Sequence, residues 1–252
     1  MLEGFTESTF THDGKTHPVF RRGTGPGVVV IHEIPGITPL VAEFGRRVGD
    51  AGFTAVLPSL FGEPGKPMGL PYVFKSFTQV CISREFTTWA LRSTSPVIEW
   101  VRALARQAHE ECGGPGVGAV GMCATGGFAL AMAVDDELLA PVLSQPSFPL
   151  AIGKRAGDLG LSDADLARVK ERVRDDGLCV MGLRFAGDRV VPRRRFEALE
   201  RELGEGFIGI EIPGKGHSVL TEHFVDEPGH PTLDALDRVI DFFRERLLKP
   251  QP

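Results

Sequence analysis

The feature that most constrains the fold is the stretch at residues 121–127, which reads GMCATGG. The apolar run before it, at 116–120, is typical of a buried strand, and residues 128–134 after it can form a helix. A strand that turns sharply into a helix needs small residues at the turn, because the two elements crowd each other there. The sequence therefore predicts that Cys123 stands at the tip of a strand–turn–helix unit, where catalytic nucleophiles are found. A buried structural cysteine is the alternative.

Segments with strand and helix patterns alternate along the chain. A hairpin is predicted at 5–21 around the turn dipeptide Asp13-Gly14. Further strands are predicted at 27–31, 53–58, 116–120, 138–144, 178–185 and 207–212, and helices at 38–51, 95–112, 128–134, 162–176, 192–203 and 233–248. This alternation predicts an α/β fold with a mostly parallel central sheet and helices on both faces. Because no linker or repeat interrupts it, residues 1–252 are predicted to form a single domain.

The segment at 59–94 is harder to assign. Glycines and prolines are frequent between residues 62 and 71 and predict a long surface loop. Four aromatic side chains follow it, namely Phe74, Phe77, Phe86 and Trp89. They either cover the core or line a pocket near the site. The pocket is favoured, because long loops in compact domains are often functional.

The composition argues against several classes of function. A formal net charge of −5 gives no basic surface for nucleic acid. No apolar run approaches the ~20 residues that cross a bilayer, and the polar start of the chain does not read as a signal peptide. The four cysteines lack C-x-x-C spacing and are sparse for a disulfide scaffold. These features predict a cytoplasmic protein with no membrane or nucleic-acid partner.

Three residues with catalytic chemistry follow predicted strands. Cys123, Asp188 and His217 each stand at the carboxyl end of a strand, the edge where open α/β sheets place their sites. Their order is nucleophile, acid, base, in which His217 would take the thiol proton and Asp188 would fix the imidazole tautomer. Singly, Asp188 could cap the next helix and His217 could simply close a glycine loop. Together they predict a catalytic triad.

Four motifs resemble the dienelactone hydrolase family of the α/β-hydrolases. They are HEIPG at 32–36, GMC at 121–123, FAGDRVVP at 185–192 and PGKGH at 213–217. The resemblance implies an α/β-hydrolase fold and an enzyme that cleaves esters or lactones through a cysteinyl acyl-enzyme. It also implies that no metal or organic cofactor takes part.

The resemblance further assigns roles around the nucleophile. Glu33 would contact the resting thiol and accept its proton when substrate enters, and the backbone amides of Ile34 and Ala124 would form the oxyanion hole. A carboxylate beside a thiol disfavours the thiolate, so the resting nucleophile would be partly silenced. The alternative for Glu33 is a solvated loop carboxylate.

Two positions depart from the family pattern. Thr125 stands two residues after the nucleophile, where glycine is usual. Thr221 stands about one turn after the histidine, where family members that cleave dienelactone carry a carboxylate-binding arginine. Arg84 could supply that charge, with Phe86 and Trp89 as further substrate contacts, although an exposed Arg84 paired with its neighbouring glutamate is the simpler interpretation. Dienelactone itself is therefore not the expected substrate.

The sequence predicts no metal site. His32 and Glu33 lack the second histidine of a zinc helix, and the remaining cysteines read as ordinary thiols. The predicted function is a cysteine hydrolase acting on a small ester or lactone, without a cofactor. Two alternatives stay open, namely a non-catalytic α/β-hydrolase-fold protein that binds a ligand or partner, and a general carboxylesterase or peptidase using the same triad.

Overall fold

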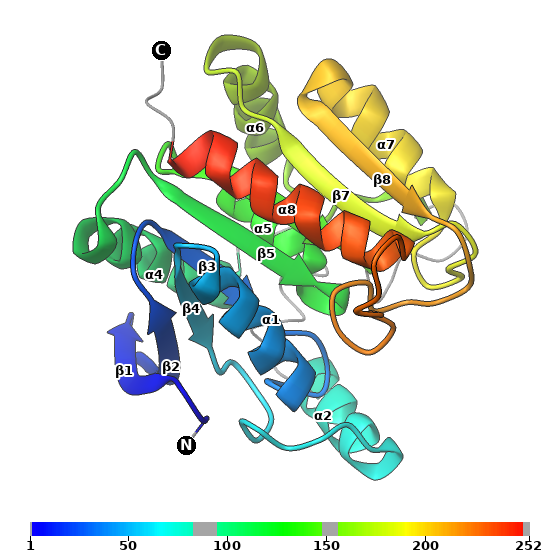
Figure 1. Cartoon of the computed structure of the whole chain (residues 1–252). Helices are drawn as coiled ribbons and strands as arrows, with labels where there is room; N and C mark the ends of the chain where they lie inside the picture. Colours follow the sequence, from blue (N-terminus) through cyan, green and yellow to red (C-terminus); the bar gives the residue numbers. More distant parts are fainter. Residues whose placement is uncertain (1, 83–94, 148–155, 249–252) are drawn as a thin grey trace.

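Eight strands form one sheet in the order β1-β2-β4-β3-β5-β6-β7-β8 (Figure 1). The structure is a computed structural model that describes residues 2–82, 95–147 and 156–248. β2 runs antiparallel to its neighbours β1 and β4, and the pairs from β4 to β8 are all parallel. The strands are β1 Thr6–His12, β2 Lys15–Gly23, β3 Gly27–Ile31, β4 Thr54–Pro58, β5 Val117–Met122, β6 Leu138–Ser144, β7 Val180–Phe185 and β8 Phe207–Ile212.

Helices cover both faces of this sheet. In β3, Val28 and Val30 belong to one core and Val29 and Ile31 to the other, because successive side chains point to opposite faces. The first core is covered by α1 Pro39–Asp50 and α8 Pro231–Leu247, and the second by α4 Pro96–Cys112, α5 Gly126–Met132, α6 Asp163–Asp175 and α7 Arg193–Leu203 (Figure 1). The predicted α/β architecture is confirmed.

Three hydroxyl side chains start helices where the sequence places them. Thr38 accepts a hydrogen bond from the Val41 amide at the start of α1, and Ser95 and Ser162 cap α4 and α6 in the same way. In the part of the chain that the structure describes, no helix has the length and apolar character to span a bilayer.

The segment at 59–94, which the sequence left unassigned after the predicted loop at 62–71, contains a helix. A helix, α2 Leu70–Ile82, follows the glycine- and proline-rich residues, and Pro71 fits its first turn, where no intrahelical amide is needed. Phe74 on this helix is 71% exposed, so it does not line a pocket among the described residues. Phe86 and Trp89 lie outside the described residues.

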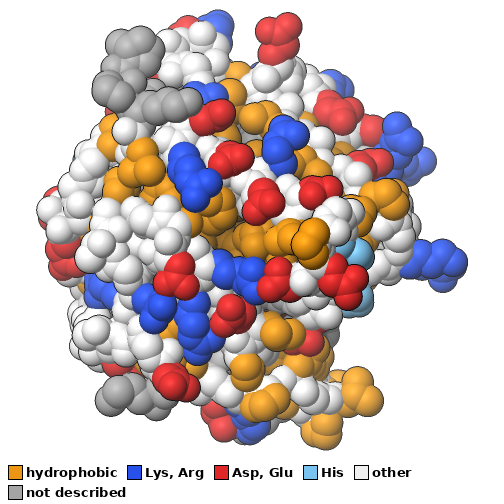
Figure 2. All heavy atoms as spheres, in the orientation of Figure 1, with side chains coloured by type: hydrophobic (Ala, Val, Ile, Leu, Met, Phe, Trp, Pro, Cys, Tyr) orange, Lys and Arg blue, Asp and Glu red, His pale blue; other side chains and the backbone are white. Residues whose placement is uncertain are grey.

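The order of the strands reverses beside β3. From β3 the chain runs outward through α1 to β4, and then returns across β3 to β5 on its other side. Parallel sheets bind ligands at such a reversal, outside the carboxyl ends of the strands. Glu33 follows β3 and Cys123 follows β5, so two of the predicted site residues stand at this point. On the face drawn in Figure 2, basic and acidic side chains are interspersed.

Candidate active site

Cys123 stands at the sharp turn from β5 into α5. Its φ of 53° is in the left-handed region that few non-glycine residues adopt. A Cβ on Gly121 would lie 2.2 Å from the Thr125 carbonyl oxygen, and one on Gly126 would lie 2.5 Å from Cα of Pro146. Glycine is therefore required on both sides of the strained cysteine, at positions 121 and 126.

Thr125 supports the turn through its hydroxyl. The side chain is fully buried, and Oγ1 accepts a hydrogen bond of 3.1 Å from the Met122 amide. The same oxygen lies within 3.1 Å of the carbonyl oxygens of Ile31, His32 and Met122, and its single proton is donated to one of them. Thr125 thus ties the turn to the end of β3, and a side chain fits at this position without preventing the turn.

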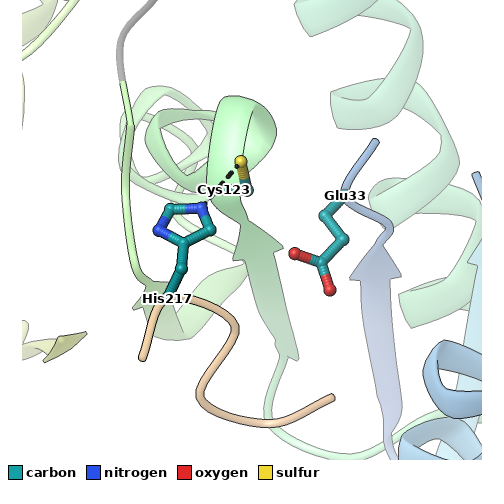
Figure 3. A group of neighbouring side chains, drawn as sticks. All are labelled: Glu33, Cys123 and His217. Atoms are coloured by element: carbon teal, nitrogen blue, oxygen red, sulfur yellow. Dashed lines mark hydrogen bonds between the residues drawn. The ribbon is translucent and has the colours of Figure 1, made fainter. Parts of the chain in front are cut away.

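The structure brings the three predicted triad residues together. His217 Nε2 lies 3.1 Å from Cys123 Sγ, and His217 Nδ1–H donates to Asp188 Oδ2 at 2.7 Å. Figure 3 shows the imidazole from the loop after β8 facing the thiol at the tip of β5. Asp188 is itself fixed, because its Oδ1 accepts from the amides of Val190 at 2.8 Å and Val191 at 3.3 Å.

Burial and hydrogen bonding shift the pKa values of His217 and Asp188 in opposite directions. Burial alone lowers the pKa of His217, but its hydrogen bonds with Asp188 and Cys123 outweigh burial and raise that pKa to about 10. Burial raises the pKa of Asp188, and the hydrogen bonds from His217 and the two backbone amides outweigh it and lower that pKa. At neutral pH, Asp188 is therefore ionised and His217 holds a proton toward the thiol.

Glu33 is buried beside the thiol but bonds to other groups. Its Oε2 accepts from Ser218 Oγ at 2.7 Å and from Gln145 Nε2 at 3.3 Å, and its Oε1 accepts from the hydroxyl of Thr221. A carboxylate oxygen of Glu33 lies within 4.8 Å of Cys123 Sγ, and the thiol itself points to the imidazole (Figure 3). Glu33 is 2% exposed, so it is not a solvated loop carboxylate.

Two site residues after β6 carried no signal in the sequence. Gln145 is fully buried with a φ of 36°, and its side chain joins Glu33 to the amide of Val219 in the histidine loop. Ser147 Oγ lies 3.3 Å from Cys123 Sγ, and the Ser147 amide donates to the Cys123 carbonyl at 2.9 Å. A positive φ at a buried glutamine is the clearest mark of a constrained site residue, and only the structure shows it.

The remaining predicted site residues stand as follows. Ile34 and Ala124 directly follow Glu33 and Cys123, at the two strand ends that form the site, and their amides as an oxyanion hole stay a prediction. Arg84, Phe86 and Trp89 lie outside the described residues, so their contact with substrate stays a prediction as well.

Comparison with known proteins decides the family. The model of the dienelactone hydrolase family matches residues 16–151, which is more than half of the chain. The chain belongs to the dienelactone hydrolase family. It is a hydrolase that acts on ester bonds. The matched residues include Glu33 and Cys123, whereas Asp188 and His217 lie beyond them and are placed by the geometry.

Three relatives of this dienelactone hydrolase family member share low sequence identity with it. A Saccharomyces cerevisiae protein named "Putative carboxymethylenebutenolidase" is 26% identical over 202 residues, which are 79% of this chain and 71% of the relative. A solved dienelactone hydrolase from Anabaena variabilis is 14% identical, with a TM-score of 0.64 over 97% of this chain and all of that one. A dienelactone hydrolase-like promiscuous phosphotriesterase from metagenomic libraries is 19% identical, with a TM-score of 0.68 over 96% and 98% of the two chains. The solved structures support the α/β-hydrolase fold alone.

The loop that carries Glu33 depends on a neutral histidine. His32 is fully buried; its Nδ1–H donates to the Glu33 carbonyl at 3.0 Å, and its Nε2 accepts from the Leu60 amide at 3.1 Å. Burial lowers the pKa of His32 from its ordinary 6.5 to about 4. If Nε2 were protonated, its N–H and the Leu60 N–H would be two donors pointing at each other, and this hydrogen bond would be lost.

Acid is expected to destabilise the fold through His32. Between pH 6.5 and 4 the unfolded chain binds more protons than the folded one, so the free energy of unfolding falls as the pH is lowered through that range. The difference between these two pKa values corresponds to a fall of about 3 kcal/mol in the free energy of unfolding. Urea unfolding at pH 7 and pH 4.5 should show this extra loss in the wild type relative to His32→Gln. An equal loss in both proteins, or an NMR titration of His32 near pH 6.5, would contradict the prediction.

Proposed function

We propose that this hydrolase cleaves small esters or lactones through a cysteinyl acyl-enzyme, with Cys123 as nucleophile, His217 as general base and acid, and Asp188 as the group that orients His217. The observation that carries the proposal is the continuous hydrogen-bonded chain from Sγ through the imidazole to a buried carboxylate. A binding protein needs no such chain, because ligand binding does not require a proton to move from a thiol.

The proposed reaction has two halves. Sγ attacks the carbonyl carbon, the proton that sulfur and imidazole share stays on His217 Nε2, and the amides of Ile34 and Ala124 donate to the oxyanion. The C–O bond breaks, and the leaving alkoxide takes the proton from Nε2. Water then attacks the thioester with His217 as base, which releases the carboxylic acid and restores the thiol.

Neutral substrates are expected to react better than anionic ones. Thr221 is 3% exposed and its hydroxyl donates to Glu33, so this position offers neither a charge nor a free donor to a substrate carboxylate. Glu33 and Asp188 also place two buried carboxylates near the reacting atoms. Loss of one arginine–carboxylate contact corresponds to roughly 1.5–3 kcal/mol, or about a tenfold to hundredfold preference in kcat/KM.

A matched pair tests this expectation, namely the dimethyl and monomethyl esters of one dicarboxylic acid at fixed ionic strength. The dimethyl ester should have the higher kcat/KM after correction for its two ester bonds. Preference for the monomethyl ester that disappears in Arg84→Ala would show that Arg84 binds the carboxylate and that the interpretation of Thr221 is wrong. A general carboxylesterase or peptidase would instead show broad activity that includes amide substrates.

Removing the charge of Glu33 is expected to make the resting thiol more reactive. The carboxylate lies within 4.8 Å of Sγ, and its negative charge opposes negative charge on the sulfur. In Glu33→Gln, iodoacetamide should label Cys123 about three- to tenfold faster, because this repulsion is removed, while turnover falls. Glu222→Gln is the matched control, because Glu222 interacts electrostatically with Glu33 but carries no proposed role. Slower labelling of Glu33→Gln would mean that Glu33 activates the thiol.

A further inference from the structure

Glu33, Cys123 and His217 present three metal-binding atoms to one point. A carboxylate oxygen, Sγ and Nε2 all lie within 4.8 Å of one another, and they come from three separate segments of the chain (Figure 3). We propose that this group binds one thiophilic divalent cation, such as Zn²⁺, and that the bound ion reversibly inhibits the hydrolase. The proposal concerns the same residues as the proposed function, but it makes no use of ester chemistry.

The donor set matches the preferences of zinc. Zn²⁺ takes cysteine sulfur, histidine nitrogen and carboxylate oxygen, and sites with three protein ligands keep a fourth position open for water. Its bonds of about 2.0–2.3 Å place neighbouring ligands about 3.5 Å apart in a tetrahedron. Sγ and Nε2 are 3.1 Å apart, so this pair needs to open only slightly. No separation in the group exceeds 4.8 Å, so the largest needs to close by about 1.3 Å at most.

Residues behind two of the three ligands, His217 and Glu33, already hold them as in a metal site. His217 Nδ1–H donates to Asp188 at 2.7 Å, so the Nε2 lone pair can face an ion once its proton leaves. Carboxylate–histidine–zinc arrangements of this kind fix the tautomer and increase the basicity of the ring. The Glu33 carboxylate is likewise held, by Ser218, Thr221 and Gln145.

The local charge favours a cation. Glu33 and Asp188 are 2% and 6% exposed, and within residues 2–82, 95–147 and 156–248 neither forms an ion pair with a lysine or arginine. The ion would replace the one proton that the thiol and imidazole share, and that proton passes to solvent. With the sulfur bound to the metal, no nucleophile remains for an ester.

Calorimetric titration of the metal-free protein with ZnCl₂ tests the site directly. We expect one Zn²⁺ per chain at the tight site, and titration with Co²⁺ should give a thiolate-to-metal charge-transfer band. Cys123→Ala should weaken Zn²⁺ binding at least about a hundredfold and abolish the band, and Glu33→Gln should weaken binding about tenfold or more. Ester cleavage by the wild type should stop at one equivalent of Zn²⁺ and return with chelator.

The controls separate this site from other thiols and from the proposed function. Cys112 and Cys179 are the other free cysteines that the structure describes, and the double variant Cys112→Ala, Cys179→Ala should bind Zn²⁺ like the wild type. Unchanged Zn²⁺ affinity in folded Cys123→Ala, or in folded Glu33→Gln, overturns the three-ligand site; circular dichroism establishes the folding. Loss of Zn²⁺ binding in Cys123→Ala with full ester cleavage would sustain the metal site and refute the proposed nucleophile, and the reverse pattern would refute the metal site alone.

Discussion

Replacing Cys123 with alanine is expected to reduce kcat/KM for ester cleavage by about four to six orders of magnitude. Loss of a nucleophile has effects of this size elsewhere, because only binding and oxyanion contacts remain. The fold should survive, since Cys123 is only partly buried and the surrounding turn is held by Gly121, Thr125 and Gly126. A neutral activated ester such as 4-nitrophenyl acetate, with spontaneous hydrolysis subtracted, gives the range needed.

Cys179→Ala is the matched control for this experiment. Cys179 is also a free, partly buried cysteine, but it contacts Gly177 and Arg246, away from the site. Its replacement should leave kcat/KM within about twofold of the wild type, as for a surface substitution without a role. Equal turnover by wild type and Cys123→Ala would remove the cysteine from the mechanism.

Changing the histidine or its acid partner is expected to have the second largest effect. His217→Ala should approach the loss seen for Cys123→Ala, and Asp188→Asn should cost about 10⁴ in kcat, because the amide cannot favour the required tautomer or stabilise the imidazolium. The double variant should be hardly worse than His217→Ala, since the residues act as one unit.

The NMR titration of His217 gives an independent test of its hydrogen bond with Asp188. Asp188 helps to raise the pKa of His217 to about 10, so the pKa of His217 should be lower in Asp188→Asn, as measured by NMR of the imidazole. Asp175→Asn is the control, because Asp175 pairs with Arg174 at the exposed end of α6. Full activity of Asp188→Asn would refute the assigned acid without affecting the fold.

Local patterns were sufficient for most of the fold. The strand that became β3, the helix starts at Thr38, Ser95 and Ser162, and the Asp13-Gly14 turn each depend on nearby residues, so the sequence predicted them. The helix α2 was missed because prolines and glycines precede it closely, and Pro71 lies inside its first turn. Proline in a sequence indicates a break in a helix, unless it is known to lie in the first turn, where it is tolerated.

In the candidate site, the sequence could predict only the residues that directly follow strands. Cys123, Asp188 and His217 follow strands, so the edge of a parallel sheet brings them together. The bonds from Gln145, Ser218 and Thr221 to Glu33 span 112 to 188 residues, and no local spacing encodes them. For the same reason, sequence spacing predicted no metal ligands, although the fold brings Glu33 close to Cys123 and His217.

Intact mass after rapid acid quench of the enzyme with an activated neutral ester tests the acyl-enzyme itself. An increment equal to the acyl group should form within the first turnover, decay at the rate of product release, and map by proteolysis to the peptide that contains Cys123. Asp188→Asn should accumulate the adduct for longer if deacylation is slowed more than acylation, and Cys123→Ala should show none. Turnover without any adduct, or an adduct on another residue, would contradict nucleophilic catalysis by Cys123.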